Sequence, residues 1–460
     1  MAIFQACFLP VAVPAPLAPD DGAAGASAAR AAPPATCALL PATLWRAGMT
    51  RGARAVASPR VVRIEDLRRL AKRRLPRLVF DYIDGGAEDE VTLRANTAAF
   101  AAVAFRPRQG VAVAAVDLRT TVLGTSLGLP LLLAPVGSCR MFHPRGEVVA
   151  AAAASAAGTA YVLSTFSGCR LEEVRDGAAG PLWYQLYVPG GRDVAEAAIA
   201  RARAAGYAAL VVTIDTPTSG MRERDFYNGT PELLRGSLLA RLPHLGQFLT
   251  RPGWVLRFLA DGGLMKFPNV VLPDGPMLYA DVTKLLERTT VTWEDLRWMR
   301  DAWRGPLLVK GILSADDARR AVDAGANGVV VSNHGGRQLD TVPASLQALP
   351  EVVAAVGGQA EVLMDGGIRR GSDVVKALCL GARAVLVGRA YAWGLGAAGY
   401  AGVARAIEIL RADLVRTMKL LGCAAVGDLD RSFVDVPPEW HAEAPARGSL
   451  RSRAARTSPR

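Results

Sequence analysis

The sequence predicts an α/β protein built as a (β/α)8 TIM barrel, and three observations point to this fold. The chain has 460 residues, which suits one large α/β domain or two medium ones. Short apolar runs recur eight times, and each ends in a polar or glycine-rich turn. Helix-like segments separate most of these runs, as in a parallel sheet covered on both faces. Eight such units match the barrel in both number and length.

The expected strands follow one another at 130–137, 160–165, 182–188, 208–215, 306–312, 327–333, 361–367 and 384–389. The expected helices lie at 145–157, 191–205, 313–324, 343–356, 370–381 and 396–421. Gly158 divides the long uncharged run 148–169 into a helix-like half and a strand-like half, so we expect no membrane span there. A doubly wound sheet is the alternative fold, but no GxGxxG motif follows the first strand.

The two ends of the chain differ from the middle. Residues 1–60 are rich in Ala and Pro without an apolar period, and 441–460 are basic, so we expect both to be disordered around a barrel domain at 61–440. These tails carry +7 of the +12 net charge, and no basic patch predicts a nucleic-acid partner. The six cysteines show no metal-ligand spacing, so we expect no metal site and a cytoplasmic protein with reduced thiols.

One connection is much longer than the others. Residues 217–292 link the fourth and fifth strands, and their middle is basic and rich in leucine. Loops of this length usually carry function. The pattern predicts an active-site lid or a contact with a membrane surface. A subunit interface or additional packing on the barrel is the alternative.

Residues with catalytic chemistry follow the strands, whose carboxyl ends meet at one face of a barrel. His334 follows the sixth strand, beside a Gly-Gly turn and Arg337. A neutral imidazole can accept a proton near pH 7, and a guanidinium can hold a carboxylate in two bonds. Asp215 ends the fourth strand and is a candidate to orient the histidine. Arg222 is a second candidate to hold an anion.

Charged and flexible residues also follow the later strands. Lys310 ends the fifth strand after four apolar residues, so it needs either an anionic ligand or an acidic partner. Glycines and arginines after strands seven and eight are the usual phosphate site of such barrels. Here they are Gly366, Gly367, Arg369, Gly388 and Arg389, preceded by Asp365. The set predicts a phosphate-bearing cofactor and a carboxylate-bearing substrate.

The segment SNHGGRQLD (332–340) resembles the active-site signature of the FMN-dependent 2-hydroxy-acid oxidase and dehydrogenase family. The resemblance runs in order from RLPRLVFDYIDGGAEDE (74–90) to LLGCAAVGDLDRS (420–432). It implies FMN as cofactor and oxidation of a lactate- or mandelate-like L-2-hydroxy acid to the 2-oxo acid. Electrons would pass to quinone, a cytochrome or oxygen.

Two other functions remain as alternatives. The WRGPLLVKGI and DGGIRRGSDVVKA segments also resemble relatives that act on peptide-derived substrates in cofactor maturation, although Arg337 favours a free carboxylate. A non-catalytic barrel that binds flavin or a partner protein is the third reading. The joint presence of His334, Arg337, Lys310 and Asp215 argues against it.

The resemblance also implies a role for each matching residue. His334 would be the base and Asp215 its orienting partner, while Tyr187 would contact the substrate hydroxyl. The substrate carboxylate would be held by Tyr82, Arg222 and Arg337. The FMN ring would meet Pro135, Val136, Gly137, Ser164, Gln185, Thr213, Lys310 and Ser332. The FMN phosphate would meet Gly366, Gly367, Gly388 and Arg389, with Asp365 and Arg369 nearby.

Some features resemble one branch of the family. MRERDFYNG (221–229) and RPGWVLRFL (251–259) are similar to the mandelate and lactate dehydrogenases, in which the insertion can dock on a membrane and electrons pass to quinone. This implies peripheral contact at the inner face of the membrane, and relatives are commonly homo-oligomers. Gly137 stands where oxidases commonly have Ala, which implies slow reaction with oxygen. Ile83 and Phe166 replace aromatic residues or Trp, so the substrate side chain stays open.

Overall fold

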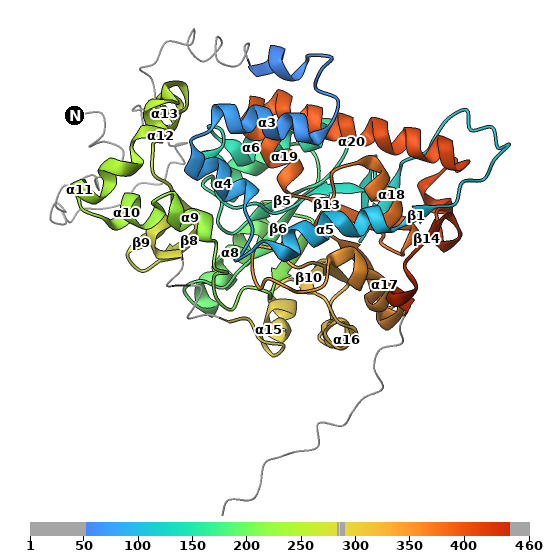
Figure 1. The fold of residues 1–460 in the computed structure, drawn as a ribbon. Helices are drawn as coiled ribbons and strands as arrows, with labels where there is room; N and C mark the ends of the chain where they lie inside the picture. The colour runs from blue at the N-terminus through green and yellow to red at the C-terminus, as the bar shows by residue number, and fades with distance from the viewer. Residues whose placement is uncertain (1–51, 283–284, 286–289, 442–460) are drawn as a thin grey trace, which may run out of the picture.

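The computed structural model describes residues 52–282, 285 and 290–441, and its centre is a closed barrel of eight parallel strands (Figure 1). The predicted fold class is therefore confirmed. The barrel strands are β4 (Leu131–Leu133), β5 (Tyr161–Ser164), β6 (Leu182–Leu186), β7 (Ala209–Thr213), β10 (Leu307–Ile312), β11 (Gly328–Val331), β12 (Glu361–Met364) and β13 (Ala384–Val387). Each strand pairs with the next, and β13 pairs with β4 to close the barrel. Every expected strand range contains one of them.

Helices cover the outside of the barrel. They are α6 (Gly146–Ala156), α7 (Leu171–Asp176), α8 (Arg192–Ala204), α15 (Asp295–Ala302), α16 (Ala315–Asp323), α17 (Ser345–Val356), α18 (Gly371–Cys379), α19 (Arg389–Ala398) and α20 (Tyr400–Leu421). The single helix expected at 396–421 is wrong in extent. Gly399 has φ 61° and ψ −134°, a conformation outside the helical region, and it separates α19 from α20.

Two layers of apolar side chains form the core. Alternate strand residues point inward and fill the barrel, and the remaining ones pack under the helices. The interior layer includes Leu132, Val162, Trp183, Val211, Leu308, Val330, Leu363 and Leu386. A hairpin of β2 (Thr120–Val122) and β3 (Thr125–Leu127) closes the opposite end of the barrel, because its buried residues join this layer. The filled interior leaves the carboxyl ends of the strands as the place for a site.

The segment before the barrel is helical. It forms α3 (Ile64–Arg74), α4 (Arg77–Asp84) and α5 (Val91–Ala102). In Figure 1 α3 lies along α19 and α20, whereas α5 packs on α17. A short pair of β1 (Ala104–Phe105) and β14 (Val434–Asp435) joins the two ends of the domain. Part of the expected disordered lead is ordered, because residues 52–56 are helical and Val56 is buried in the core. Residues 1–51 and 442–460 lie outside the described residues.

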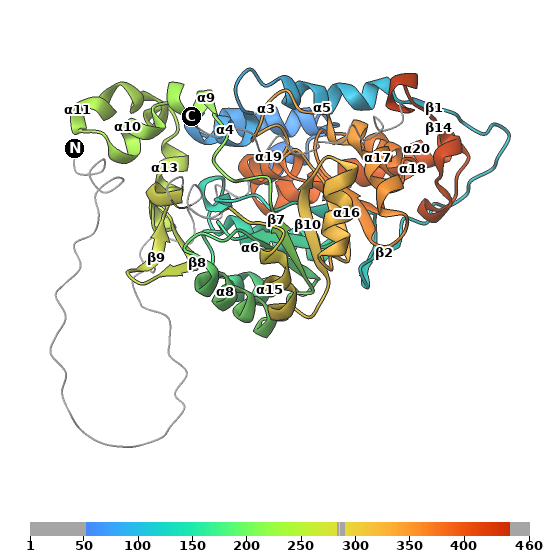
Figure 2. The ribbon, with the colours of Figure 1, turned by 90° about the horizontal axis from the view of Figure 1, so that it is seen from below.

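The long connection between β7 and β10 forms a separate group of elements at one side of the barrel (Figure 2). It contains α9 (Glu223–Tyr227), α10 (Thr230–Arg235), α11 (Leu238–Arg241), α12 (Gly246–Leu249) and α13 (Pro252–Ala260). A hairpin of β8 (Lys266–Leu272) and β9 (Gly275–Leu278) follows, which the sequence did not predict. Within the described part of the chain, no helix is long and apolar enough to cross a membrane.

Candidate active site

A cavity of about 290 Å³ opens at the carboxyl ends of the barrel strands. Its wall includes residues that lie in or soon after each of the eight strands, together with Tyr82 and Ile83 of α4. Of the residues predicted for the site, all but four line this cavity. The four that do not are Gln185, Thr213, Asp215 and Ser332, which lie behind its wall and bond to or neighbour lining residues. The structure thus brings the predicted residues together.

His334 and Asp215 form a hydrogen-bonded pair in this wall. The Nδ1 atom of His334 lies 2.9 Å from Oδ1 of Asp215. A carboxylate can only accept, so Nδ1 carries the proton and Nε2 is left as the basic atom. Nε2 lies 3.4 Å from the hydroxyl of Tyr187. His334 adopts φ 57°, an uncommon value for a residue with a Cβ, and its backbone N–H donates to Ser332 Oγ at 3.1 Å.

The electrostatic surroundings keep this pair in the state that a general base requires. Burial lowers the pKa of His334, and the positive charges of Lys310 and Arg337 lower it further against the opposing effect of Asp215. Burial alone raises the pKa of Asp215, but His334 and Lys310 outweigh burial and hold it below its usual range. At neutral pH the imidazole is therefore neutral and the carboxylate charged. The side chain of Gln338 donates to the Asp215 carbonyl at 3.0 Å and fixes its backbone.

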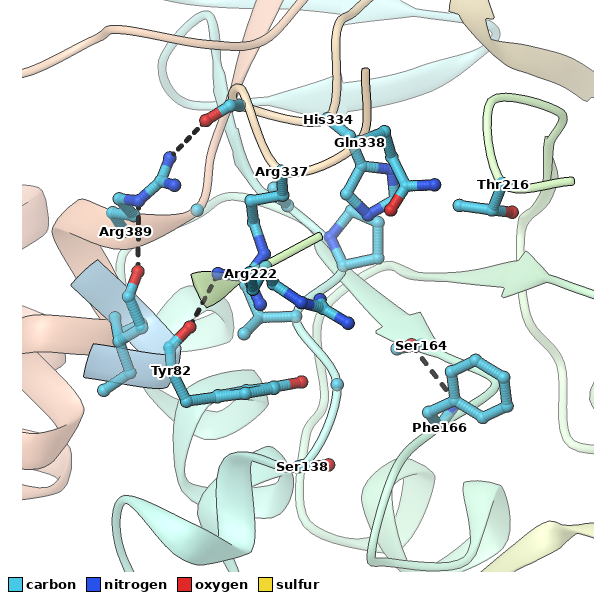
Figure 3. A pocket seen from close by; sticks show the side chains of 18 of the residues that line it. Tyr82, Ser138, Ser164, Phe166, Thr216, Arg222, His334, Arg337, Gln338 and Arg389 are labelled. Atoms are coloured by element: carbon cyan, nitrogen blue, oxygen red, sulfur yellow. Dashed lines mark hydrogen bonds between the residues drawn. The ribbon is translucent and has the colours of Figure 1, made fainter. Parts of the chain in front are cut away.

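Two guanidinium groups point into the space beside this base. Figure 3 shows Arg222 and Arg337 with Tyr82 next to them. One nitrogen of Arg337 donates to the Tyr82 carbonyl at 2.6 Å, and its guanidinium lies 5.0 Å from the centre of the Tyr82 ring. Arg222 lies 3.6 Å from a carboxylate oxygen of Asp225. Burial and the charge of Arg222 lower the pKa of Arg337. An anion bound between the two arginines would relieve this repulsion.

Lys310 has an acidic partner at the bottom of the cavity. Its Nζ lies 3.3 Å from Asp365 Oδ2 and donates to Ser332 Oγ at 2.8 Å. Burial lowers the pKa of Lys310, but Asp365 and Asp215 outweigh burial and raise it, so the lysine stays charged. Asp365 is therefore the acidic partner that the sequence left open for Lys310.

Several buried polar atoms at this end of the barrel have no hydrogen-bond partner among the residues that the structure describes. They are Gln185 Nε2, Thr213 Oγ1, Asp215 Oδ2 and Asp365 Oδ1. Buried polar atoms are nearly always hydrogen-bonded in native proteins, so an orphaned group of them indicates a polar ligand. Donors and acceptors at the edge of a flavin ring fit this set.

The far end of the cavity has two arginines that form no ion pair with a carboxylate of the described residues. Arg389 donates to the carbonyls of Ile83, Gly335 and Gly85, and no described carboxylate pairs with it. Burial lowers the pKa of Arg389 and that of Arg369, the latter to about 10. Gly367 has φ 80°, and a Cβ there would collide with the carbonyl of Asn96. This glycine turn and the arginines fit the phosphate of a cofactor.

The insertion supplies lining residues that the sequence did not predict. They are Ser219, Asp225, Thr230, Leu234, Phe267, Tyr279, Ala280 and Val282. Phe166, which follows β5, stacks on Tyr187 with ring centres 4.9 Å apart and packs on Phe267 of β8. Asp225 could have been predicted from the sequence, because it lies three residues after Arg222 and this spacing places the two side chains together. The others depend on how the insertion folds back.

These features are those of a barrel enzyme with a site for a phosphate-bearing cofactor, beside a candidate histidine base and a pair of arginines placed to bind an anion. Comparison with known proteins agrees with this class. The model of the FMN-dependent dehydrogenase family matches residues 71–436. L-lactate oxidase from Nostoc sp. is 44% identical over 384 residues, which are 83% of this chain and 99% of that protein. Pre-mycofactocin synthase from Mycobacterium tuberculosis is 43% identical over 376 residues, which are 80% of this chain and 92% of that protein.

Solved structures agree as well. The crystal structure of the monotopic membrane protein (S)-mandelate dehydrogenase matches with a TM-score of 0.76 and 40% identity, over 82% of this chain and 99% of that one. The chain therefore belongs to the FMN-dependent dehydrogenase family. It is an oxidoreductase, and FMN is its cofactor, as the sequence predicted.

Proposed function

We propose that this protein oxidises an L-2-hydroxy acid to the 2-oxo acid, with bound FMN as the immediate oxidant. One observation carries the proposal: the His334–Asp215 pair and the two guanidiniums of Arg222 and Arg337 serve the same cavity. A 2-hydroxy acid needs both features, because it carries a carboxylate to be held and a hydroxyl to be deprotonated. The named relatives, a lactate oxidase and a mandelate dehydrogenase, support this substrate class.

Binding orients the substrate in this proposal. Arg222 and Arg337 hold its carboxylate, and the Tyr82 hydroxyl adds a third bond. Tyr187 contacts the substrate hydroxyl, since its own hydroxyl lies 3.4 Å from His334 Nε2. This arrangement directs the substrate hydroxyl and α-carbon toward the base.

The reaction removes two electrons and two protons from the substrate. FMN, when bound, supplies the two-electron acceptor. In one route His334 Nε2 would take the hydroxyl proton while hydride leaves the α-carbon for the flavin. In the other it would take the α-proton, after which the electron pair would pass to the flavin and the hydroxyl proton would be released. Asp215 stabilises the resulting imidazolium across the 2.9 Å bond. Lys310 offers a fixed positive charge where reduced flavin gathers negative charge.

The cofactor would lie along the floor of the cavity. Its ring would run along Pro135, Val136 and Gly137, and its polar edge would meet Ser164, Gln185, Thr213 and Ser332. Its phosphate would be held by Gly366, Gly367, Arg369, Gly388 and Arg389. The orphaned polar atoms and the arginines without acidic partners support this placement.

The insertion supports a membrane-associated electron acceptor. Four leucines on its helices are exposed, namely Leu239, Leu242, Leu249 and Leu256. We therefore propose peripheral contact with the inner face of a membrane and electron transfer to quinone, with a cytochrome or oxygen as other acceptors. The mandelate dehydrogenase with a similar fold is described as a monotopic membrane protein. The resemblance also supports a cytoplasmic homo-oligomer.

A second candidate function rests on one observation. Pre-mycofactocin synthase is nearly as similar to this chain as the lactate oxidase is, at 43% against 44% identity. An FMN barrel acting on a peptide-derived substrate is therefore the alternative. The pair of Arg222 and Arg337 favours a substrate with a free carboxylate.

The deciding experiment is a visible spectrum of the purified holoenzyme without oxygen, before and after addition of L-lactate and then L-mandelate. The proposal expects the oxidised-flavin band to bleach with at least one acid. A flavin band that persists with a full panel of 2-hydroxy acids would refute the proposed substrate class and favour the peptide-derived one.

A further inference from the structure

A second, smaller cavity of about 80 Å³ lies between α4 and the helices of the insertion. Its wall is almost entirely carbon. The residues that line it alone are Leu78, Val79, Met141, Leu233, Phe248, Trp254, Val255, Phe258 and Leu264. Protein interiors are close-packed, and voids larger than a water molecule are few. This space therefore needs an explanation.

The second cavity adjoins the first one. Tyr82, Asp225, Thr230, Leu234 and Tyr279 line both. Tyr82 lies against Arg337, and Asp225 lies against Arg222, so this shared wall begins at the two arginines. A molecule whose carboxylate is held there can extend an apolar group into the second cavity.

Aromatic side chains keep this space open and apolar. Trp254 stacks on Phe258 with ring centres 4.6 Å apart, and Phe248 packs on Trp254 at 5.9 Å. The indole N–H of Trp254 donates to the Met141 carbonyl at 2.8 Å. Its only polar atom is thereby satisfied, and the ring offers carbon to the cavity. Such a space holds hydrocarbon better than it holds water.

We infer that this cavity receives the substrate side chain, and that the substrates are 2-hydroxy acids with an apolar side chain of about six carbon atoms. The inference rests on the proposed function. One water-sized group needs roughly 10–15 Å³ of cavity, so the 80 Å³ cavity holds about six such groups. Methyl, the side chain of lactate, would leave it empty.

The test follows flavin reduction in the holoenzyme by stopped flow without oxygen. The probes are the L-isomers of lactate, 2-hydroxybutanoate, 2-hydroxyhexanoate, 2-hydroxyoctanoate and 2-hydroxydodecanoate. We expect the second-order rate constant to rise about fourfold for each methylene that enters the cavity. The rise should end near 2-hydroxyoctanoate, whose side chain has six carbons.

Two neighbouring residues of α13 give a matched pair of variants. Val255 lines the cavity, whereas Leu256 is 57% exposed. Val255→Phe should reduce the ratio of the 2-hydroxyoctanoate rate to the lactate rate by tenfold or more, and Leu256→Phe should leave this ratio unchanged. Leu264→Phe, at an exposed edge of the cavity, is a second filling variant if Val255→Phe does not fold.

Three outcomes would overturn the inference. The first is reduction by lactate with no gain along the series, which would leave the proposed function intact. The second is a Val255→Phe enzyme that keeps the wild-type ratio. The third is a Val255→Phe enzyme that slows only reoxidation by long-tailed quinones, which would assign the cavity to the acceptor. Failure of every acid to reduce the flavin would instead refute the proposed function.

Discussion

Replacing Asp215 by Asn tests how the histidine base is prepared. The exchange keeps the size of the side chain but removes its charge. Asn can also present its amide N–H to His334 Nδ1, which favours the tautomer with the proton on Nε2. The basic atom would then be lost from the side of the cavity that faces Tyr187, 3.4 Å away.

The expected loss follows from the 2.9 Å bond between His334 and Asp215. Hydrogen bonds to charged groups contribute about 1.5–3 kcal/mol. If this bond reaches its full strength only as the imidazolium forms, its loss in the variant lowers the rate of flavin reduction by roughly 10- to 150-fold. A reversed tautomer adds to this loss, so the lower figure is the minimum.

The variant should also change the pH profile. His334 already has a lowered pKa because of burial, and Asp215 opposes that effect. Removing the carboxylate lowers the pKa of His334 further. The rate depends on the neutral imidazole, so its acid limb should move to lower pH.

Stopped-flow reduction of the flavin across pH 5 to 9 measures both effects. Asp261→Asn is the control, because Asp261 is similarly shielded and paired with Arg140 at 2.7 Å, but neither Arg140 nor its other partner Arg145 lines the cavity. It should leave the rate and profile as in the wild type. Two results would refute the assignment of His334 as the base and Asp215 as its partner. One is a rate of flavin reduction in Asp215→Asn that is less than threefold below that of the wild type, and the other is an acid limb that moves to higher pH.

Three further predictions concern other charged groups. Arg337→Lys should lower kcat/KM for 2-hydroxy acids by roughly 10- to 100-fold while the flavin spectrum is kept, because an ammonium cannot make two parallel bonds to a carboxylate; unchanged steady-state kinetics would contradict this. Arg389→Met should raise the Kd of FMN by roughly tenfold or more and leave the Kd of riboflavin unchanged, as measured by flavin fluorescence. An equal rise in both Kd values would rule out a phosphate contact. Burial, with Arg74 and Arg257, lowers the pKa of His143 to about 4. The fold keeps this histidine neutral while the unfolded chain takes up a proton below about pH 6.5, so the free energy of unfolding should fall by about 3 kcal/mol between pH 6.5 and 4. His143→Gln should remove this part of the slope in urea titrations, and an unchanged slope would contradict the reasoning.

The barrel could be predicted from the sequence because its signals are local. Each strand is a short apolar run with a polar or glycine turn after it, and the turn residues are the ones that reach the cavity. His334, Arg337 and Arg389 could therefore be placed at one face without knowing any contact. Their arrangement within that face followed from the resemblance to a family.

Other features depend on contacts between distant residues and could not be predicted in this way. The helical pattern continues through Gly399, so only the backbone of the folded chain shows the turn between α19 and α20. Lys310 and Asp365 lie on β10 and directly after β12, and no local pattern pairs them. The hairpin of β8 and β9 and the second cavity exist only because the insertion folds back on α4.

The net charge of the residues at the main cavity suits two bound anions, the cofactor phosphate and the substrate carboxylate. Of the described residues that line it, five are cations, namely Arg222, Lys310, Arg337, Arg369 and Arg389. Two carboxylates, Asp225 and Asp365, line it with them, and Asp215 lies directly behind. Five positive and three negative charges leave +2. A phosphate ester brings about −1.5 to −2 at neutral pH. In the proposed function, the remaining attraction for the substrate carboxylate then comes from Arg222 and Arg337, because Lys310 is paired with Asp365 and the far arginines would meet the phosphate. The site would therefore separate two kinds of anion by position, so that one cavity could hold the cofactor firmly and still release the product.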